Sequence, residues 1–98
     1  MIHKLNDENF DSLTDKGLKL IEFSTSWCGY CKKQEPILEE MDKVWIGQVD
    51  GDEAQYLVQK FHIQVYPTFL VLKDGKEVSR FSGYHSKFDL MNILMNYL

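Results

Sequence analysis

The hydrophobic and polar positions along the chain follow two patterns, one typical of buried strands and one typical of amphipathic helices. Residues 18–23 are mostly apolar and predict a central strand buried on both faces. Further strands are predicted at residues 44–49, 68–73 and 77–82. Asp74-Gly75, between the last two, is a strong signal for a two-residue hairpin turn.

Apolar residues at helical spacing fill the intervals between these strands. The first helix should have Asn6 or Asp7 as its N-cap. Pro36 should kink the second helix, because proline lacks an N–H and clashes with the preceding turn. A capping box from Ser86 to Asp89 should begin the last helix. The predicted helices span residues 6–13, 31–41, 52–61 and 86–98.

The order of these elements places the chain in the α/β class. Alternating strands and helices predict a parallel half-sheet covered by helices on both faces, and the closing hairpin adds antiparallel strands. We therefore expect a central mixed sheet. The 98 residues, 44% of them hydrophobic, suit a single globular domain over residues 1–98 and are too few for two.

Charge and hydropathy exclude several classes of function. The net charge of -4 argues against nucleic-acid binding, which needs a basic face. The apolar runs are too short to cross a bilayer, so no membrane association is expected. The first ten residues lack a basic segment followed by an apolar one, so we expect a cytoplasmic location. The acidic residues Asp50, Asp52 and Glu53 are expected to form a solvated turn before a helix.

The only two cysteines, Cys28 and Cys31, follow Trp27 at the predicted junction between a strand and a helix. A disulfide between them would close a loop too short to stabilise the fold much, so a reactive pair is the better interpretation. Cys28 precedes a helix N-terminus, where free N–H groups lower the pKa of a thiol. Cys28 is therefore the predicted nucleophile. Cys31 should be more buried and should resolve the mixed disulfide.

The stretch FSTSWCGYCKKQEPILEE, the turn VYPTF and the ending KDGKEVSRFSGYHS resemble the thioredoxins. The shared motifs are W-C-x-x-C, a proline five residues after the second cysteine, and Pro67-Thr68 before a strand. The resemblance covers nearly the whole chain from Leu18 onward. It implies the thioredoxin fold, reduction of protein disulfides, a reductase resembling thioredoxin reductase as electron donor, no bound cofactor and a monomer.

The resemblance also assigns residues to substrate binding. Pro67 corresponds to a cis-proline that faces the cysteines in this family. A cis bond there would hold Tyr66 so that its backbone pairs with an extended substrate strand. Gly29 would let the backbone pass close to a substrate. The expected rim of this groove consists of Trp27, Tyr30, Tyr66, Gly83 and Tyr84.

Three positions depart from the usual pattern of the family. Tyr30 replaces a proline between the cysteines, and we expect a less reducing potential from it. Glu22 stands where thioredoxins bury an aspartate, so burial should raise its pKa and it could accept the proton of Cys31. A Glu22 that points to the surface remains the alternative. Gln48 replaces the usual partner lysine, which removes a countercharge from Glu22.

Other functions remain open from the sequence. Tyr30 also suggests a glutaredoxin-like enzyme that uses glutathione, although Trp27, Pro36 and the lack of a second glycine beside Gly83 oppose it. A dithiol that binds a metal or cluster would need two chains or external thiols. The three histidines are scattered and form no zinc-binding spacing, so no metal residue is assigned. A non-catalytic adaptor is disfavoured by the presence of both cysteines.

Overall fold

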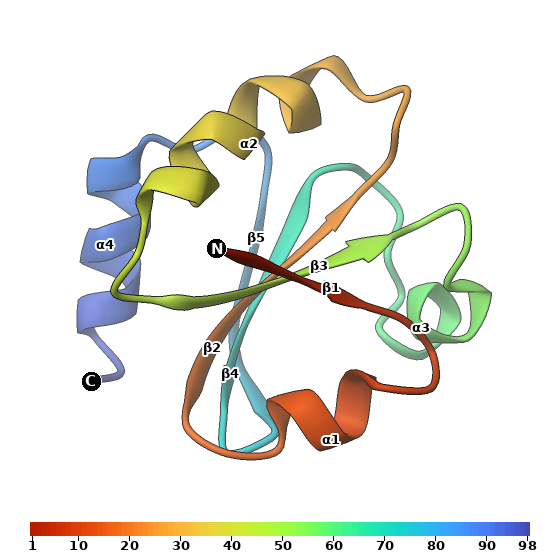
Figure 1. The fold of residues 1–98 in the computed structure, drawn as a ribbon, viewed down its shortest axis with the longest axis horizontal. Helices are drawn as coiled ribbons and strands as arrows, with labels where there is room; N and C mark the ends of the chain where they lie inside the picture. Colours follow the sequence, from red (N-terminus) through yellow and green to blue (C-terminus); the bar gives the residue numbers. More distant parts are fainter.

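The computed structural model describes all residues from 1 to 98 and contains one five-stranded sheet with four helices (Figure 1). In chain order the elements are β1 (Ile2–Leu5), α1 (Phe10–Thr14), β2 (Leu18–Ser24), α2 (Gly29–Glu40), β3 (Trp45–Asp50), α3 (Gln55–Lys60), β4 (Thr68–Lys73), β5 (Lys76–Ser82) and α4 (Lys87–Met95).

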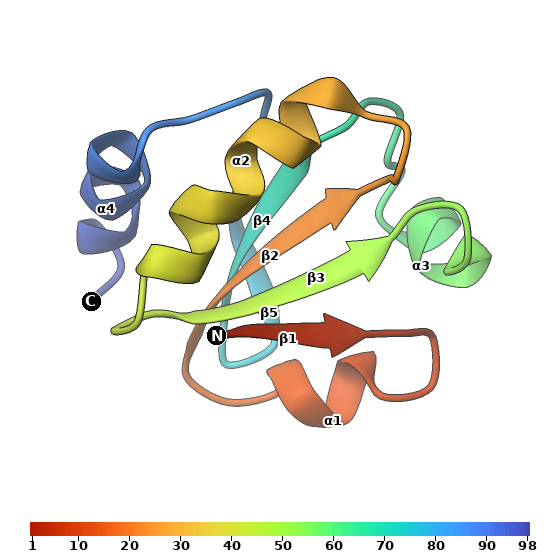
Figure 2. The same cartoon turned by 45° about the horizontal axis from the view of Figure 1, so that its top comes forward.

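The sheet is mixed, as predicted, and its strand order is β1-β3-β2-β4-β5. Strands β1, β3 and β2 are parallel, whereas β4 pairs antiparallel with both β2 and β5. Helices α2 and α4 cover one face, and α1 and α3 cover the other (Figures 1 and 2). The α/β class and the thioredoxin fold are therefore confirmed.

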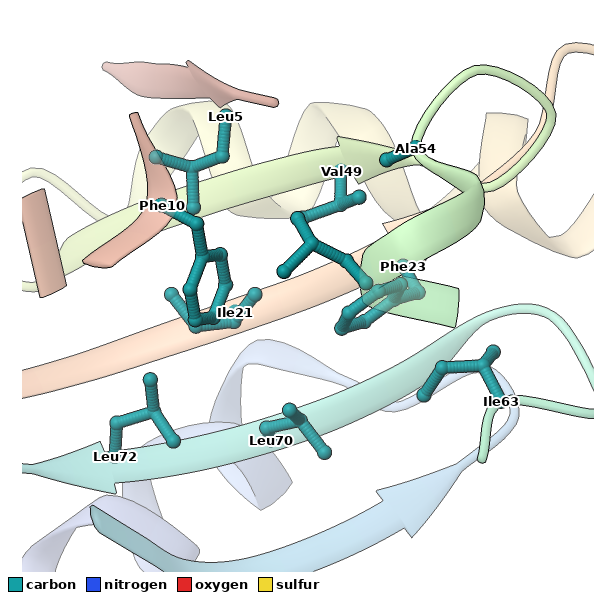
Figure 3. Packing of buried hydrophobic residues seen from close by; sticks show 10 residues of the cluster. Leu5, Phe10, Ile21, Phe23, Val49, Ala54, Ile63, Leu70 and Leu72 are labelled. Carbon is teal, nitrogen blue, oxygen red and sulfur yellow. The ribbon is translucent and has the colours of Figure 1, made fainter. Parts of the chain in front are cut away.

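Two hydrophobic clusters fill the space between the sheet and its helices. Because successive side chains of a strand point to opposite faces, β2 contributes to both clusters. Ile21 and Phe23 pack on the side of α1 and α3 (Figure 3), whereas Leu20 packs on the side of α2 and α4. Glu22 shares the face of Leu20, so a carboxyl group lies beneath α2 within an apolar layer.

The ends of several elements differ from the prediction. Strand β1 was not predicted, and helix α1 begins at Phe10 rather than at residue 6. Asn6 accepts hydrogen bonds from the N–H groups of Glu8 (2.9 Å) and Asn9 (2.8 Å), so it closes a turn before the helix. Helix α3 begins at Gln55 rather than at residue 52. Before α3, Asp50 Oδ1 accepts the N–H of Asp52 at 2.9 Å, so a side chain closes a turn ahead of this helix as well.

The turn chemistry near the C-terminus agrees with the prediction. Asp74 (φ 51°) and Gly75 (φ 82°) both have positive φ, as a two-residue hairpin between β4 and β5 requires. Ser86 Oγ accepts the N–H of Asp89 at 3.1 Å and so caps α4. Pro36 lies inside α2, as expected. No helix combines the length and the apolar composition needed to cross a membrane.

Candidate functional site

Cys28 and Cys31 form a disulfide at the start of α2, and their Cα atoms are 5.2 Å apart. Cys28 is the N-cap of the helix, and its Sγ accepts the backbone N–H of Cys31 at 3.2 Å. The predicted placement before a helix N-terminus is therefore confirmed. Cys31 is the less exposed of the two, at 4% against 7%. A thiolate on Cys28 would retain an N–H donor and the positive end of the helix dipole.

The turn before β4 lies directly against the cysteines. The peptide bond between Tyr66 and Pro67 is cis, as predicted, and the Tyr66 carbonyl oxygen lies 3.5 Å from Cys28 Sγ. Gly83, whose φ is 86°, donates its N–H to the Pro67 carbonyl at 2.9 Å. The end of β5 is thus joined to the turn that faces Cys28.

The predicted aromatic rim is only partly brought together by contacts within the protein. Trp27 is 67% exposed and Tyr30 is 65% exposed, so both rings are open to a partner. The Trp27 ring meets the half-buried Tyr66 ring edge to face, with centroids 5.9 Å apart. Tyr84 is half-buried, and the Lys33 ammonium lies 4.5 Å from its ring centroid.

The turn after β3 holds two of these aromatic rings in place. The Trp27 indole N–H donates to Asp52 Oδ2 at 2.9 Å, so Asp52 is more than the solvated turn residue that we expected. The Tyr66 ring rests against the backbone of Gly51, where any Cβ would overlap the ring. Burial raises the pKa of Tyr66, and the charges of Asp52 and Asp50 raise it further. The role of Gly51 was not predicted from the sequence.

Glu22 is fully buried, which rejects the alternative of a surface-pointing side chain. Its pKa is raised to about 7, chiefly by burial. The hydrogen bond from Gln48 lowers the pKa, the charge of Glu35 raises it, and the charge of Lys4 lowers it. Glu22 Oε1 accepts the amide N–H of Gln48 at 2.9 Å, while Oε2 has no partner. The proton of the neutral form therefore belongs on Oε2.

Gln48 is buried at the position where the resemblance suggested a missing countercharge. Its amide nitrogen donates to Glu22 Oε1 and to Glu35 Oε1, both at 2.9 Å. Its amide oxygen accepts a hydrogen bond from the Lys4 ammonium. Lys4, Gln48 and Glu22 lie in one row across β1, β3 and β2. The expected loss of a countercharge is thus incomplete, because Lys4 supplies one from the edge strand.

A polar cleft of about 540 Å³ opens beside this row. Cys31, Gln48 and Thr25 lie in its wall, and the hydroxyl of Thr25 is buried without a hydrogen-bond partner. The second cysteine therefore borders a polar space distinct from the side on which Cys28 meets Tyr66. Water in such a cleft would have polar partners.

Gln34 belongs to the architecture of the site and was not identified from the sequence. The side chain is fully buried; it donates to the His85 carbonyl at 2.9 Å and accepts the His85 N–H at 2.8 Å. This pair of bonds ties α2 to the loop that carries Gly83 and Tyr84. Its position three residues after Cys31 places it on the buried face of the helix, and that spacing was the available signal.

Comparisons with known proteins agree with this geometry. A family model described as Thioredoxin matches residues 1–96. The chain is 37% identical to a thioredoxin of Staphylococcus haemolyticus over 102 residues, which covers 99% of this chain and 98% of that protein. It is 37% identical to a thioredoxin of Chlamydia pneumoniae, with 96% of each chain covered. A thioredoxin of Staphylococcus aureus is 35% identical, with 99% and 98% covered. These matches give no support to the glutaredoxin-like or metal-binding alternatives.

Proposed function

Because the chain belongs to the thioredoxin family, we propose that Cys28 attacks substrate disulfides and that Cys31 resolves the intermediate. The chain is a thiol–disulfide oxidoreductase that reduces protein disulfides. The observation that carries the division of roles is the N-cap position of Cys28, whose sulfur accepts the N–H of Cys31. That donor stabilises a thiolate on Cys28, and the sulfur of Cys31 accepts no such hydrogen bond.

The reaction proceeds in two exchanges. The Cys28 thiolate attacks one sulfur of the substrate disulfide, a new bond forms between Cys28 and that sulfur, and the other substrate sulfur leaves as a thiolate. Cys31 then loses its proton and attacks Cys28 Sγ, which releases the second substrate thiolate. The substrate gains two electrons, and the enzyme ends as the Cys28–Cys31 disulfide.

Glu22 is the proposed acceptor of the Cys31 proton. A carboxyl group whose pKa is near 7 is populated in both protonation states around neutrality, which suits a group that takes up and releases a proton in each cycle. The unpartnered Oε2 is the atom that would carry the proton. The buried position of Glu22 beneath α2 supports this role, because Cys31 lies on the buried side of the same helix.

The proposed substrate groove follows the turn that faces Cys28. Support comes from the Tyr66 carbonyl beside Cys28 Sγ and from the exposed rings next to it. An extended segment of a substrate would pair with this backbone, and the aromatic side chains would cover it. The residues assigned to substrate binding are Trp27, Gly29, Tyr30, Tyr66, Pro67, Gly83 and Tyr84.

The partners follow from the family in general form: disulfide-containing substrates and a reductase that returns electrons. We propose a dedicated reductase resembling thioredoxin reductase, since returning the Cys28–Cys31 disulfide to the dithiol takes two electrons from an external donor. We further propose that residues 1–98 act as one domain and as a monomer. A reductant of this kind belongs in a reducing compartment, which supports the cytoplasm as its location.

Trapping of substrates tests the assignment of the two cysteines. A Cys31→Ser variant should attack substrates but not release them, so mixed disulfides should accumulate and disappear on treatment with dithiothreitol. The matched Cys28→Ser variant should trap far less, because its remaining thiol lacks the N-cap environment. Equal trapping by both variants would contradict the assignment.

A further inference from the structure

The amide of Gln48 joins three charged side chains that lie far apart in the sequence. Its nitrogen donates to the carboxylates of Glu22 and Glu35, and its oxygen accepts from the Lys4 ammonium. The opposite orientation of the amide would place its oxygen against two carboxylates and its nitrogen against an ammonium. Only the observed orientation satisfies all three contacts.

Gln48 does not itself carry a proton, because an amide neither gains nor loses one near neutral pH; it contributes only donors and an acceptor. It holds the buried carboxyl group of Glu22 at a fixed place relative to two exposed charges of opposite sign. Glu35 and Lys4 are both exposed to solvent, unlike the carboxyl group of Glu22. The amide bound to the buried carboxyl group of Glu22 therefore also contacts one negative and one positive side chain.

We infer that Lys4 and Glu35 are positioning residues that act through Gln48 to set the fraction of Glu22 that is ionised. The inference deepens the proposed function and rests on the role of Glu22 as acceptor of the Cys31 proton. It also assigns a task to β1, the edge strand, which contributes no residue to the substrate groove.

The surroundings of Glu22 offer few competing charges. From α2, Glu35 reaches the Gln48 amide that binds Glu22, and from β1 Lys4 reaches the same amide. The adjoining cleft is also lined by Cys31 and by three further charged residues, Lys32, Asp50 and Glu53. Strand β3 presents the uncharged Gln48, and β4 presents Phe69, which lies in register with Glu22. Glu35 and Lys4 are the two exposed charges that contact the amide bound to Glu22.

The signs of the two effects are opposite. A negative Glu35 disfavours the ionised form of Glu22 and raises its pKa, whereas a positive Lys4 favours that form and lowers the pKa. Glu35→Gln should therefore lower the titration midpoint of Glu22, and Lys4→Met should raise it. For exposed charges near a titrating group we expect shifts of roughly 0.3 to 1 pH unit.

Direct titration of Glu22 tests the inference without any activity assay. The full-length oxidised protein would be labelled with ¹³C at the glutamate carboxyl carbons, and their NMR chemical shifts would be followed against pH. The Glu22→Gln variant would identify the Glu22 signal by its absence. Glu35→Gln and Lys4→Met would be compared with Glu39→Gln on α2 and Lys76→Met on β5, which remove exposed charges elsewhere. Lys4→Arg keeps the charge and should leave the midpoint near that of the wild type.

Opposite shifts in Glu35→Gln and Lys4→Met, with both controls unmoved, would support the inference. Unchanged midpoints, or shifts of the same sign, would overturn it. The pH profile for resolution of a mixed disulfide then tests the proposed function separately. If the Glu22 midpoint moves in both variants while that rate profile stays fixed, the inference stands and Glu22 is not the proton acceptor.

Discussion

Substitution of Glu22 by glutamine should change how the stability of the protein depends on pH. The pKa of Glu22 is about 7 in the folded protein, against 4.5 for an ordinary glutamate. The folded state therefore binds more protons than the unfolded state between these values, and its free energy of unfolding falls as the pH rises. The contribution of Glu22 is fully present below about pH 4.5 and is lost by about pH 7 to 8.

The size of this stability loss follows from the difference between the folded and unfolded pKa values of Glu22. Each pH unit between them costs about 1.4 kcal/mol of stability, so the ionisation of Glu22 should remove ~3 kcal/mol in all. Because the side chain is completely buried, solvent screening does not reduce this value much. In Glu22→Gln the side chain stays neutral and nearly isosteric, so this loss should be absent.

The assay is urea unfolding of the oxidised proteins, followed by tryptophan fluorescence at a series of pH values. In the oxidised form neither cysteine titrates, and carboxyl groups remote from Glu22 cancel in the difference between variant and wild type. As the pH rises from acidic to weakly alkaline, the free energy of unfolding of Glu22→Gln should increase by ~3 kcal/mol relative to that of the wild type. Glu39→Gln is the matched control, and it should show the pH dependence of the wild type. Parallel pH dependences for wild type and Glu22→Gln would contradict a raised pKa of Glu22 in the folded protein.

Further substitutions test the packing and the tuning of the site. Gly51→Ala should displace the Tyr66 ring and cost about 1 to 3 kcal/mol of unfolding free energy, and an unchanged urea midpoint would contradict that contact. Gln34→Leu should leave the N–H and carbonyl of His85 without partners and cost roughly 2 to 3 kcal/mol in the same assay, whereas a neutral effect would mean that water replaces both bonds. Tyr30→Pro should make the redox potential more negative in equilibration with glutathione, and an unchanged potential would show that Tyr30 does not tune it.

Local patterns predicted most of the fold. Strand β2 reads as buried on both faces because it lies in the middle of the sheet between α-helical layers. The Asp74-Gly75 hairpin and the Ser86 cap depend on neighbouring residues alone, so both were predictable. Strand β1 is an edge strand of four residues whose only sheet partner is β3. So short a segment shows no clear alternation of hydrophobic and polar residues.

The electrostatic arrangement of the site depended on long-range register. The sequence indicated that Glu22 would be buried and that Gln48 would lie beside it. It did not indicate that the pairing of β1 with β3 would bring Lys4 to Gln48, nor that Glu35 would reach the same amide. These contacts join residues up to 44 positions apart, and nothing in either local segment specifies them.

The contacts among Trp27, Asp52, Gly51 and Tyr66 were likewise not predictable from local sequence. A glycine in an acidic stretch reads as a turn residue, and only the folded chain shows that the Tyr66 ring occupies the space of its missing side chain. Residues that face the cysteines were therefore predictable by type, whereas the residues that hold them in place were not.

The proposed division of roles requires that the N-cap environment makes Cys28, and not Cys31, the reactive thiol. The most direct measurement is limited alkylation of the fully reduced protein with iodoacetamide below one equivalent, followed by mass spectrometry of the peptide that contains both cysteines. We expect the label to lie almost entirely on Cys28 across the neutral pH range. Predominant labelling of Cys31, or equal labelling of both sulfurs, would contradict it.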